Sequence, residues 1–249
     1  MLKKWEKLPE NLRTEQVRPY YEKLRKKRLS MFFKRAFDIV VSAVMLVLLS
    51  PVFLVLAVAI RIDSKGPVFY RQVRCTQYGK EFRIFKFRTM VCNADKIGAQ
   101  VTVNNDPRIT RVGNVIRKYR LDEICQLIDV FRGTMSFVGT RPEVPKYVQQ
   151  YTPEMMATLL LPAGVTNETC IYYKDESKLL DASDNPDDTY VKDVLPGKMF
   201  YNLKAIERLS FLHDIAVMFM TVFAVLGKDY TPKEFPESAS TREKELVEK

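Results

Sequence analysis

Residues 39–60 read IVVSAVMLVLLSPVFLVLAVAI, a run of 22 residues without a charged side chain that decides the fold. A straight helix of this length would measure about 33 Å, which is enough to cross the hydrocarbon core of a bilayer. Ser50-Pro51 lies at its middle, and because proline removes a backbone donor we expect a kink there. Two interpretations stay open: a spanning helix with a tolerated proline, and a re-entrant helix hairpin that enters and leaves on one face.

Basic blocks flank this run. Residues 1–35 carry 12 basic and four acidic side chains, and residues 71–141 carry 14 basic and six acidic. The positive-inside rule places basic flanks in the cytoplasm, so the charge favours the re-entrant helix, whereas the length favours the spanning helix. Basic and aromatic residues interleave over 11–35, which suits an interfacial amphipathic helix on anionic lipid as well as a flexible basic arm. The apolar run 215–226 is too short to span and suits a core helix or a second interfacial helix.

The composition of the whole chain narrows the function classes. Its 249 residues include 40 basic and 30 acidic side chains, a net charge of +10, and 47% hydrophobic residues. This excludes a wholly disordered chain and points to anionic partners at a membrane surface before nucleic acid. The single His213 excludes a multi-histidine metal site, and four cysteines without a CxxC pair exclude a zinc ribbon.

The rest of the sequence predicts an α+β fold that is mostly α. Strand-forming residues predict a β-hairpin with strands near 68–75 and 81–88, joined by a turn at Gln77-Tyr78-Gly79-Lys80. Apolar residues at helical spacing predict a helix over 113–132 with a break near residue 120 and an end at Gly133. Further helices are expected over residues 93–100, 175–180 and 198–226, and in parts of 142–161.

Asp122-Glu123 is the strongest candidate for chemistry. The pair lies near an expected helix start and follows Arg117-Lys118-Tyr119-Arg120, so the helix dipole and the arginines would both keep the carboxylates ionised. Ionised carboxylates suit a nucleophile or a metal ligand better than a general acid. An Asp-Glu pair taken at random is more often a solvated first turn, and that interpretation stays open.

Several cations surround this pair in the sequence and suit phosphate binding. Lys86 and Arg88 share one face of their strand, and arginine forks match phosphate oxygens. Basic residues beside two carboxylates at a membrane face suggest Mg²⁺-assisted phosphoryl chemistry on a lipid or nucleotide, although each cation alone could be a surface residue. The candidate substrate-binding residues are Lys86, Arg88, Arg108, Arg111, Arg117, Arg141 and Pro142.

Ordered motifs along the chain carry a further signal. They read KRAFD (34–38), SP (50–51), GPVFYRQ (66–72), FKFRTM (85–90), DPRITRVG (106–113), LDE (121–123) with QL (126–127), GTMSFVG (133–139) and RPE (141–143). Over about residues 31–230 these motifs resemble the bacterial sugar transferases, also called small monotopic phosphoglycosyl transferases. No single motif is specific, but their order is.

This resemblance implies transfer of a phosphosugar from a UDP-sugar to undecaprenyl (polyprenyl) phosphate, with release of UMP, as the first membrane step of bacterial glycan assembly. It implies that Asp122 is the catalytic nucleophile and holds a covalent phosphosugar, that Glu123 acts with it, and that Mg²⁺ lies by Asp122 and Glu123. It also implies a re-entrant membrane helix broken at Ser50 and Pro51. The resemblance therefore favours the hairpin over the spanning helix. Only about 35 residues precede that run, so the chain looks like the small form of the family.

These interpretations divide the chain into four parts: a basic amphipathic arm (1–35), a re-entrant membrane helix (36–62), a catalytic domain (63–230) and a polar tail (231–249). The expected location is the bacterial inner membrane, with the catalytic domain and both termini in the cytoplasm. The expected partners are UDP-sugar, undecaprenyl phosphate and anionic membrane lipid, with no nucleic acid. Downstream glycosyltransferases and a second copy of the chain (a homodimer) are further candidates.

Some positions depart from the pattern of the family. Cys125 and Thr140 stand where proline is usual, Arg120 stands where a capping serine is frequent, and residues 167–170 are unusual. Residues 172–180 match only one branch, which leaves the donor sugar open. The alternative function is a catalytically inactive, membrane-tethered basic scaffold that binds anionic lipid or nucleic acid. It explains the charge and the apolar run, but neither the Asp-Glu pair nor the ordered motifs.

Overall fold

A computed structural model of the chain describes residues 2–94, 106–174, 176, 180, 183, 185–232 and 234–235. Most of the expected helices over 93–100 and 175–180, and most of the polar tail, lie outside the described residues. The remaining predictions can be compared with the structure.

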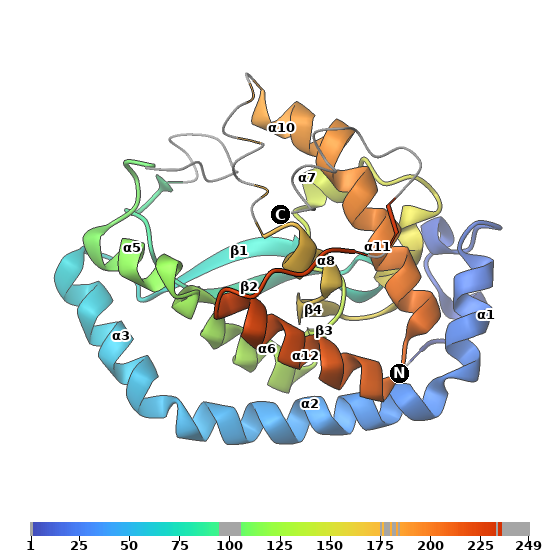
Figure 1. Cartoon of the computed structure of the whole chain (residues 1–249), viewed down its shortest axis with the longest axis horizontal. Coiled ribbons are helices and arrows are strands. Elements are labelled where there is room, and N and C mark those ends of the chain that lie inside the picture. Colours follow the sequence, from blue (N-terminus) through green and yellow to red (C-terminus); the bar gives the residue numbers. More distant parts are fainter. Residues whose placement is uncertain are drawn as a thin grey trace.

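Three helices form the outer border of the molecule: α1 (Arg18–Lys26), α2 (Arg28–Leu48) and α3 (Ser50–Asp63) (Figure 1). The expected kink is present, because α2 and α3 are bent by 60° at their junction. Pro51 cannot donate to the carbonyl of Val47, and the Ser50 hydroxyl donates to that carbonyl at 2.8 Å instead. Among the described residues no single helix is long and apolar enough to cross a membrane; the bent α2–α3 pair meets that test by length and composition alone.

The predicted β-hairpin is confirmed and lies at the centre of the molecule (Figure 1). Strands β1 (Phe69–Cys75) and β2 (Glu81–Phe87) pair antiparallel, and η3 (Gln77–Gly79) forms the turn. A second sheet was not predicted: β3 (Met135–Val138) and β4 (Ala163–Thr166) pair in parallel. These strands are four residues long, too short to show the period-2 pattern that reveals a strand.

The break near residue 120 and the helix end at Gly133 are also confirmed. Arg120 has a left-handed φ of 55°, and it separates α5 (Arg111–Lys118) from η4 (Leu121–Gln126). Helix α6 (Leu127–Arg132) ends at Gly133, whose φ of 83° suits glycine. The other helical elements are η1 (Trp5–Lys7), η2 (Glu10–Leu12), α7 (Pro145–Val148), η5 (Met155–Leu160), α8 (Glu168–Tyr172), α10 (Pro186–Thr189), η6 (Tyr190–Val194), α11 (Leu195–Arg208) and α12 (Phe211–Val225). The fold is therefore α+β and mostly α, as predicted.

Polar contacts join the inner face of α2 to the rest of the molecule. Lys34 pairs with Asp214 of α12 at 2.6 Å and donates to the carbonyl of Val138 at 2.7 Å. Buried Asp38 accepts a hydrogen bond from the Phe137 amide at 3.2 Å. The opposite side of α2 carries exposed apolar residues, as do α3 and α12; they include Val40, Val44, Val47, Leu54, Val58, Leu212, Phe219 and Phe223. These helices thus have one face fixed to the protein and another left apolar and uncovered.

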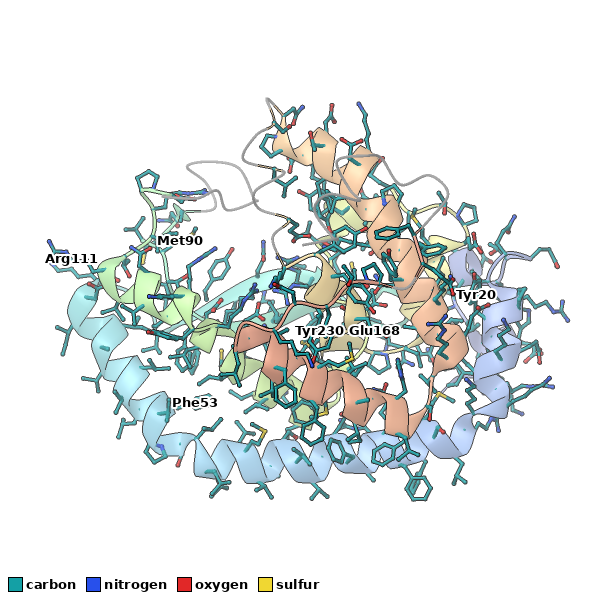
Figure 2. All side chains as sticks on the ribbon, viewed as in Figure 1. Tyr20, Phe53, Met90, Arg111, Glu168 and Tyr230 are labelled. Carbon is teal, nitrogen blue, oxygen red and sulfur yellow. The ribbon has the colours of Figure 1, made fainter. Side chains whose placement is uncertain are left out.

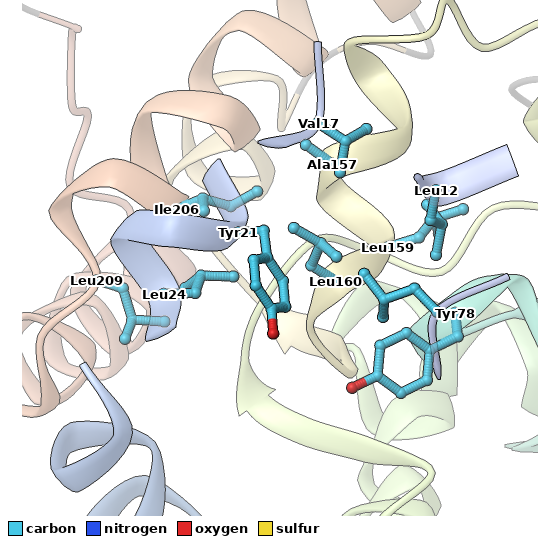
Figure 3. Packing of buried hydrophobic residues seen from close by; sticks show 11 residues of the cluster. Leu12, Val17, Tyr21, Leu24, Tyr78, Ala157, Leu159, Leu160, Ile206 and Leu209 are labelled. Carbon is cyan, nitrogen blue, oxygen red and sulfur yellow. The ribbon is translucent and has the colours of Figure 1, made fainter. Parts of the chain in front are cut away.

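The N-terminal residues contribute to the hydrophobic core. Leu12, Val17, Tyr21 and Leu24 are buried in one cluster with residues of η5 and α11, which include Leu160, Ile206 and Leu209 (Figure 3). The sequence had favoured either an interfacial helix on lipid or a flexible arm for this segment. In the structure the apolar face of α1 packs against the protein, and we call residues 2–26 the N-terminal strap.

Candidate active site

A cavity of about 840 Å³ lies between the β-hairpin, η4, the loop after β3, and α8. It brings together eight of the nine residues that the sequence singled out for catalysis and substrate binding: Lys86, Arg88, Arg108, Arg117, Asp122, Glu123, Arg141 and Pro142. The ninth, Arg111, does not line the cavity. It is exposed at the first position of α5, at the outer edge of the molecule (Figure 2).

Two cations hold the Glu123 carboxylate. Lys86 on β2 donates to Oε1 at 3.1 Å, and the Arg141 guanidinium bonds both carboxylate oxygens, Oε2 at 3.3 Å. By contrast, the Asp122 carboxylate interacts with its own backbone amide but has no hydrogen bond or ion pair with any other described residue. The left-handed turn at Arg120 starts η4, and this short helix presents both carboxylates to the cavity. One carboxylate is therefore fixed, and its neighbour is available.

The two carboxylates also differ in acidity. Burial alone would raise the pKa of Glu123, but Arg141 and Lys86 hold the pKa of that carboxyl well below its usual range. Burial raises the pKa of Asp122, opposed by the charge of Lys86 and reinforced by that of Glu123. The expected effect of the nearby cations therefore dominates the pKa of Glu123, whereas for the pKa of Asp122 burial outweighs it. Asp122 is the more basic of the two.

The cations around the cavity are not equivalent. Arg88 is 5% exposed, and it donates to the carbonyls of Ser64 and Lys65, just past α3, at 2.7 and 2.8 Å. Arg108 pairs with Asp106 and donates to the Ala94 carbonyl at 2.9 Å. The guanidinium of Arg117 forms no hydrogen bond or ion pair with the part of the chain that the structure describes. Arg88 and Arg108 thus shape the wall, and Arg117 has its guanidinium available for an anion.

The carboxylates can be tested against the predicted Mg²⁺. No group of three or more His, Cys, Asp or Glu side chains within the described ranges could hold a metal ion by itself. Mg²⁺ is commonly held by one or two carboxylates together with substrate phosphates and water. Asp122 offers one such carboxylate, whereas Glu123 would have to give up part of its pairing with Arg141 or Lys86. The donor set fits an ion that shares its ligands with a bound phosphate.

A second group of polar residues lines the cavity and was missed by the sequence analysis. The Tyr190 hydroxyl donates to Glu143 Oε1, and Lys198 Nζ donates to the Tyr190 hydroxyl at 3.2 Å. Arg74 of β1 lies 3.9 Å from Glu143 Oε2. Glu143 belongs to the RPE motif and could have been chosen on that ground. No pattern marks Tyr190 or Lys198, because long-range packing alone places them beside Glu143.

The comparison with known sequences shows which family this fold and cavity belong to. The chain belongs to the bacterial sugar transferase family, since the sequence model described as "Bacterial sugar transferase" matches residues 29–228. It is 34% identical to the UDP-N-acetylgalactosamine-undecaprenyl-phosphate N-acetylgalactosaminephosphotransferase of Aeromonas hydrophila. It is 35% identical to the UDP-glucose:undecaprenyl-phosphate glucose-1-phosphate transferase of Escherichia coli K12, and 33% identical to the undecaprenyl-phosphate galactose phosphotransferase of Salmonella typhimurium LT2.

These alignments cover most of this chain but less of the relatives. They span 78%, 78% and 82% of this chain, in that order. The chain itself spans 44%, 40% and 42% of the length of the same three relatives. The comparison therefore establishes the family of the shared region.

Proposed function

We propose that the protein transfers a phosphosugar from a UDP-sugar to undecaprenyl phosphate, releases UMP, and does so through a covalent intermediate on Asp122. One observation carries the proposal: in a cation-lined cavity, Asp122 has no partner among the described residues, while adjacent Glu123 is held by Lys86 and Arg141. The names of the three relatives, all undecaprenyl-phosphate sugar phosphotransferases, support the substrate classes.

In the first half-reaction an Asp122 carboxylate oxygen attacks the phosphorus that bears the sugar. A new oxygen–phosphorus bond forms, and the bond from that phosphorus to the bridging oxygen breaks, so UMP leaves with the electron pair. Lys86, Arg117 and Arg141 line the same cavity and would stabilise the charge spread over the transferred phosphate. The higher pKa of Asp122 makes it a better nucleophile than Glu123.

In the second half-reaction an oxygen of undecaprenyl phosphate attacks the same phosphorus. The bond to Asp122 breaks, and the carboxylate is restored as the polyprenyl diphosphate sugar leaves. Bound Mg²⁺, held by Asp122 and substrate phosphate, would offset the charge of the diphosphate. Because the phosphosugar is held on Asp122 and UMP leaves before the acceptor reacts, the kinetics should be ping-pong.

The proposed location is the cytoplasmic (inner) membrane, with the bent α2–α3 pair inserted as a re-entrant helix and the catalytic domain and both termini in the cytoplasm. The uncovered apolar residues of α2, α3 and α12 support contact with acyl chains. The basic residues of the N-terminal strap support contact with anionic lipid headgroups. Downstream glycosyltransferases and a homodimer remain predictions, as does the absence of a nucleic-acid partner.

The inactive scaffold is not favoured. A scaffold would need the apolar helices and the basic surface, but it would not need a half-buried carboxylate without a partner among the other described residues beside a second one held by two cations. Such an arrangement costs stability and is typical of sites that bind or transform a ligand.

UMP release tests the proposal directly. The full chain in lipid nanodiscs is given undecaprenyl phosphate, Mg²⁺ and each of several UDP-sugars, and UMP is quantified over time. We expect release with at least one donor, dependent on the acceptor beyond the first turnover. Absence of UMP with every donor, from protein that is folded and inserted, would count against catalysis and for the scaffold.

A further inference from the structure

The lining of the cavity includes, besides Asp122 and the cations near it, a second group of polar residues. We call it the distal lobe and define it by Arg74, Glu143, Cys170, Glu176, Tyr190 and Lys198, all of which line the cavity. It is built from β1, the loop after β3, α8, the start of η6, and α11. None of these six residues has a role in the phosphoryl transfer described above.

Charged and polar groups of the distal lobe are buried and joined to one another. Lys198 is 6% exposed, and it donates to Glu176 Oε2 at 2.9 Å and to the Tyr190 hydroxyl at 3.2 Å. Tyr190 in turn donates to Glu143, which is 7% exposed. A buried ionic group of this kind is seldom more stabilising than apolar side chains of the same volume. Its position on a cavity wall therefore indicates recognition of a ligand rather than a contribution to folding.

The charge balance of the distal lobe differs from that around Asp122. At the Asp122 end, Lys86 and Arg141 share the single carboxylate of Glu123, and Arg117 forms no ion pair with the described residues. That end has positive charge in excess, which suits a diphosphate.

Each lysine or arginine of the distal lobe, and Lys174 beside it, has a carboxylate nearby. Lys198 pairs with Glu176, Arg74 lies beside Glu143, and Lys174 pairs with Asp229. No cation is left over for an anionic group among these described residues. The distal lobe therefore suits a polar group without charge, one with hydroxyls that donate to carboxylates and accept from Lys198 and Tyr190.

We propose that the distal lobe is the sugar subsite of the donor and that it selects an uncharged hexose. This rests on the proposed function, in which a UDP-sugar offers two neutral polar parts, the sugar and the nucleoside. The three relatives are named for different sugars, N-acetylgalactosamine, glucose and galactose, but for one carrier lipid. Cys170 and Glu176 of the distal lobe lie in two stretches of interest: residues 167–170, which are unusual for the family, and residues 172–180, which match only one branch of it. The part of the site where this chain is distinctive is thereby matched with the part of the substrate that differs among the relatives.

The experiment measures kcat/KM for UDP-glucose, UDP-galactose, their N-acetylamino counterparts and UDP-glucuronate. The wild-type chain should use its best neutral donor at least about 100-fold better than UDP-glucuronate, since the carboxylates of the distal lobe repel a uronate. Glu176→Gln should change the ratio between two C4 epimers by about tenfold or more, because it alters one hydrogen-bonding partner of the sugar. The inhibition constant of UMP should stay within about twofold of wild type, since UMP carries no sugar.

Two further variants provide a second test of the distal lobe and a matched control. Lys198→Gln should affect the same ratios, and its melting temperature shows whether loss of the buried charge has unfolded it. Lys192→Gln is the matched control, because Lys192 lies on η6 with a side chain 72% exposed and does not line the cavity. It should leave every ratio unchanged.

Three results would overturn the assignment. An equal loss of kcat/KM for all donors, together with weaker inhibition by UMP, would indicate that the distal lobe binds the nucleoside. Unchanged ratios in both Glu176→Gln and Lys198→Gln would indicate that it binds no part of the donor. UDP-glucuronate used as well as the neutral donors would refute the selection of uncharged sugars. If the wild type releases no UMP from any donor, the proposed function fails instead. Thermal stabilisation then decides the subsite: UDP-sugars should stabilise wild type more than UMP does, and Glu176→Gln should remove that excess.

Discussion

Asp122 and Glu123 are neighbours in the sequence with the same functional group, and the structure gives them opposite surroundings. Glu123 neutralises two cations and is held in place by them. Asp122 is left without a partner in the part of the chain that the structure describes, and burial makes it more basic than an ordinary aspartate. Two adjacent residues of η4 thus provide one anion that is held in place and one that is left available.

Asp122→Asn should abolish transfer without loss of the fold. Because the folded-state pKa of Asp122 is raised, its ionised form costs stability at neutral pH, and the neutral amide removes that cost. We therefore expect a melting temperature equal to or above that of wild type. Wild type given donor alone should gain one phosphosugar in intact-protein mass spectrometry, on the peptide that holds Asp122. An adduct on another residue, or full turnover by Asp122→Asn, would refute the nucleophile.

The acidic limb of the pH–rate profile should report on Asp122. The raised pKa means that the nucleophile is protonated, and activity lost, at a higher pH than for a typical aspartate with a pKa of about 3.9. Glu123→Gln removes a neighbouring negative charge and releases Lys86 and Arg141, and both changes lower the pKa of Asp122. The limb should shift to lower pH in this variant, measured on whatever turnover remains. A shift to higher pH would mean that another group controls the limb.

Arg117 and Arg111 form a matched pair on one helix. Arg117 lines the cavity with its guanidinium available, while Arg111 is exposed and outside it. Arg117→Ala should lower kcat/KM by about 10- to 100-fold, the loss of a charged hydrogen bond of about 1.5–3 kcal/mol. Arg111→Ala should leave kcat/KM near wild type, and membrane association should change little in both. Equal effects of the two substitutions would place the donor phosphates elsewhere.

At the scale of elements, the junction of α2 and α3 combines two residues with separate effects. Pro51 removes a backbone donor, and the Ser50 hydroxyl satisfies the Val47 carbonyl that is left over. The break is thus built into the chemistry of the Ser50-Pro51 pair and does not depend on distant packing. This explains why the sequence alone predicts it.

The proposed topology can be tested with single cysteines at the two ends. Glu10→Cys and Ser240→Cys, each in a Cys92→Ser background because Cys92 is exposed, should both resist a membrane-impermeant thiol reagent in whole cells. Both should react after the cells are opened. Pro51→Ala restores a helical donor, so we expect a straighter helix that begins to expose one end. Labelling of a single end in the parent protein would indicate a spanning helix and contradict the re-entrant arrangement.

Other elements differ in how well the sequence predicts them. The β-hairpin was predictable because two seven-residue strands flank a turn with glycine at a positive φ. The β3–β4 sheet was not, since its strands join residues about 28 positions apart, Met135 with Ala163, and each is too short to show a pattern. In the site, Asp122 and Glu123 were predictable from their motif. The hydrogen bonds of Arg88 to the end of α3 and the burial of Lys198 were not predictable, because both depend on contacts between residues distant in the sequence.

At the scale of the whole molecule, the N-terminal strap belongs to the same hydrophobic cluster as η5 and α11. All of its residues (2–26) lie before the region that matches the family, which begins at residue 29. The strap therefore adds core area to this chain beyond the shared domain.

Leu24→Ala should lower the free energy of unfolding by about 2–5 kcal/mol, because Leu24 is fully buried and its loss leaves a cavity. Denaturant unfolding in detergent, followed by fluorescence, measures the change. Leu29→Ala is the control, since Leu29 is exposed at the start of α2; it should leave unfolding unchanged and weaken vesicle binding instead. A stable Leu24→Ala protein would mean that the strap is not part of the folded core.

The strap also sets the order in which the protein can mature on the ribosome. Tyr21 and Leu24 of α1 emerge early, yet Ile206 and Leu209 of the same cluster are translated about 180 residues later. At roughly 5–20 residues per second, that interval lasts about 10–40 s. Throughout it, the apolar side of the strap and the whole of the α2–α3 segment are exposed on a nascent chain without their final neighbours. The core can therefore close only after synthesis has passed α11, and until then these apolar residues are open to a chaperone or to the lipid surface.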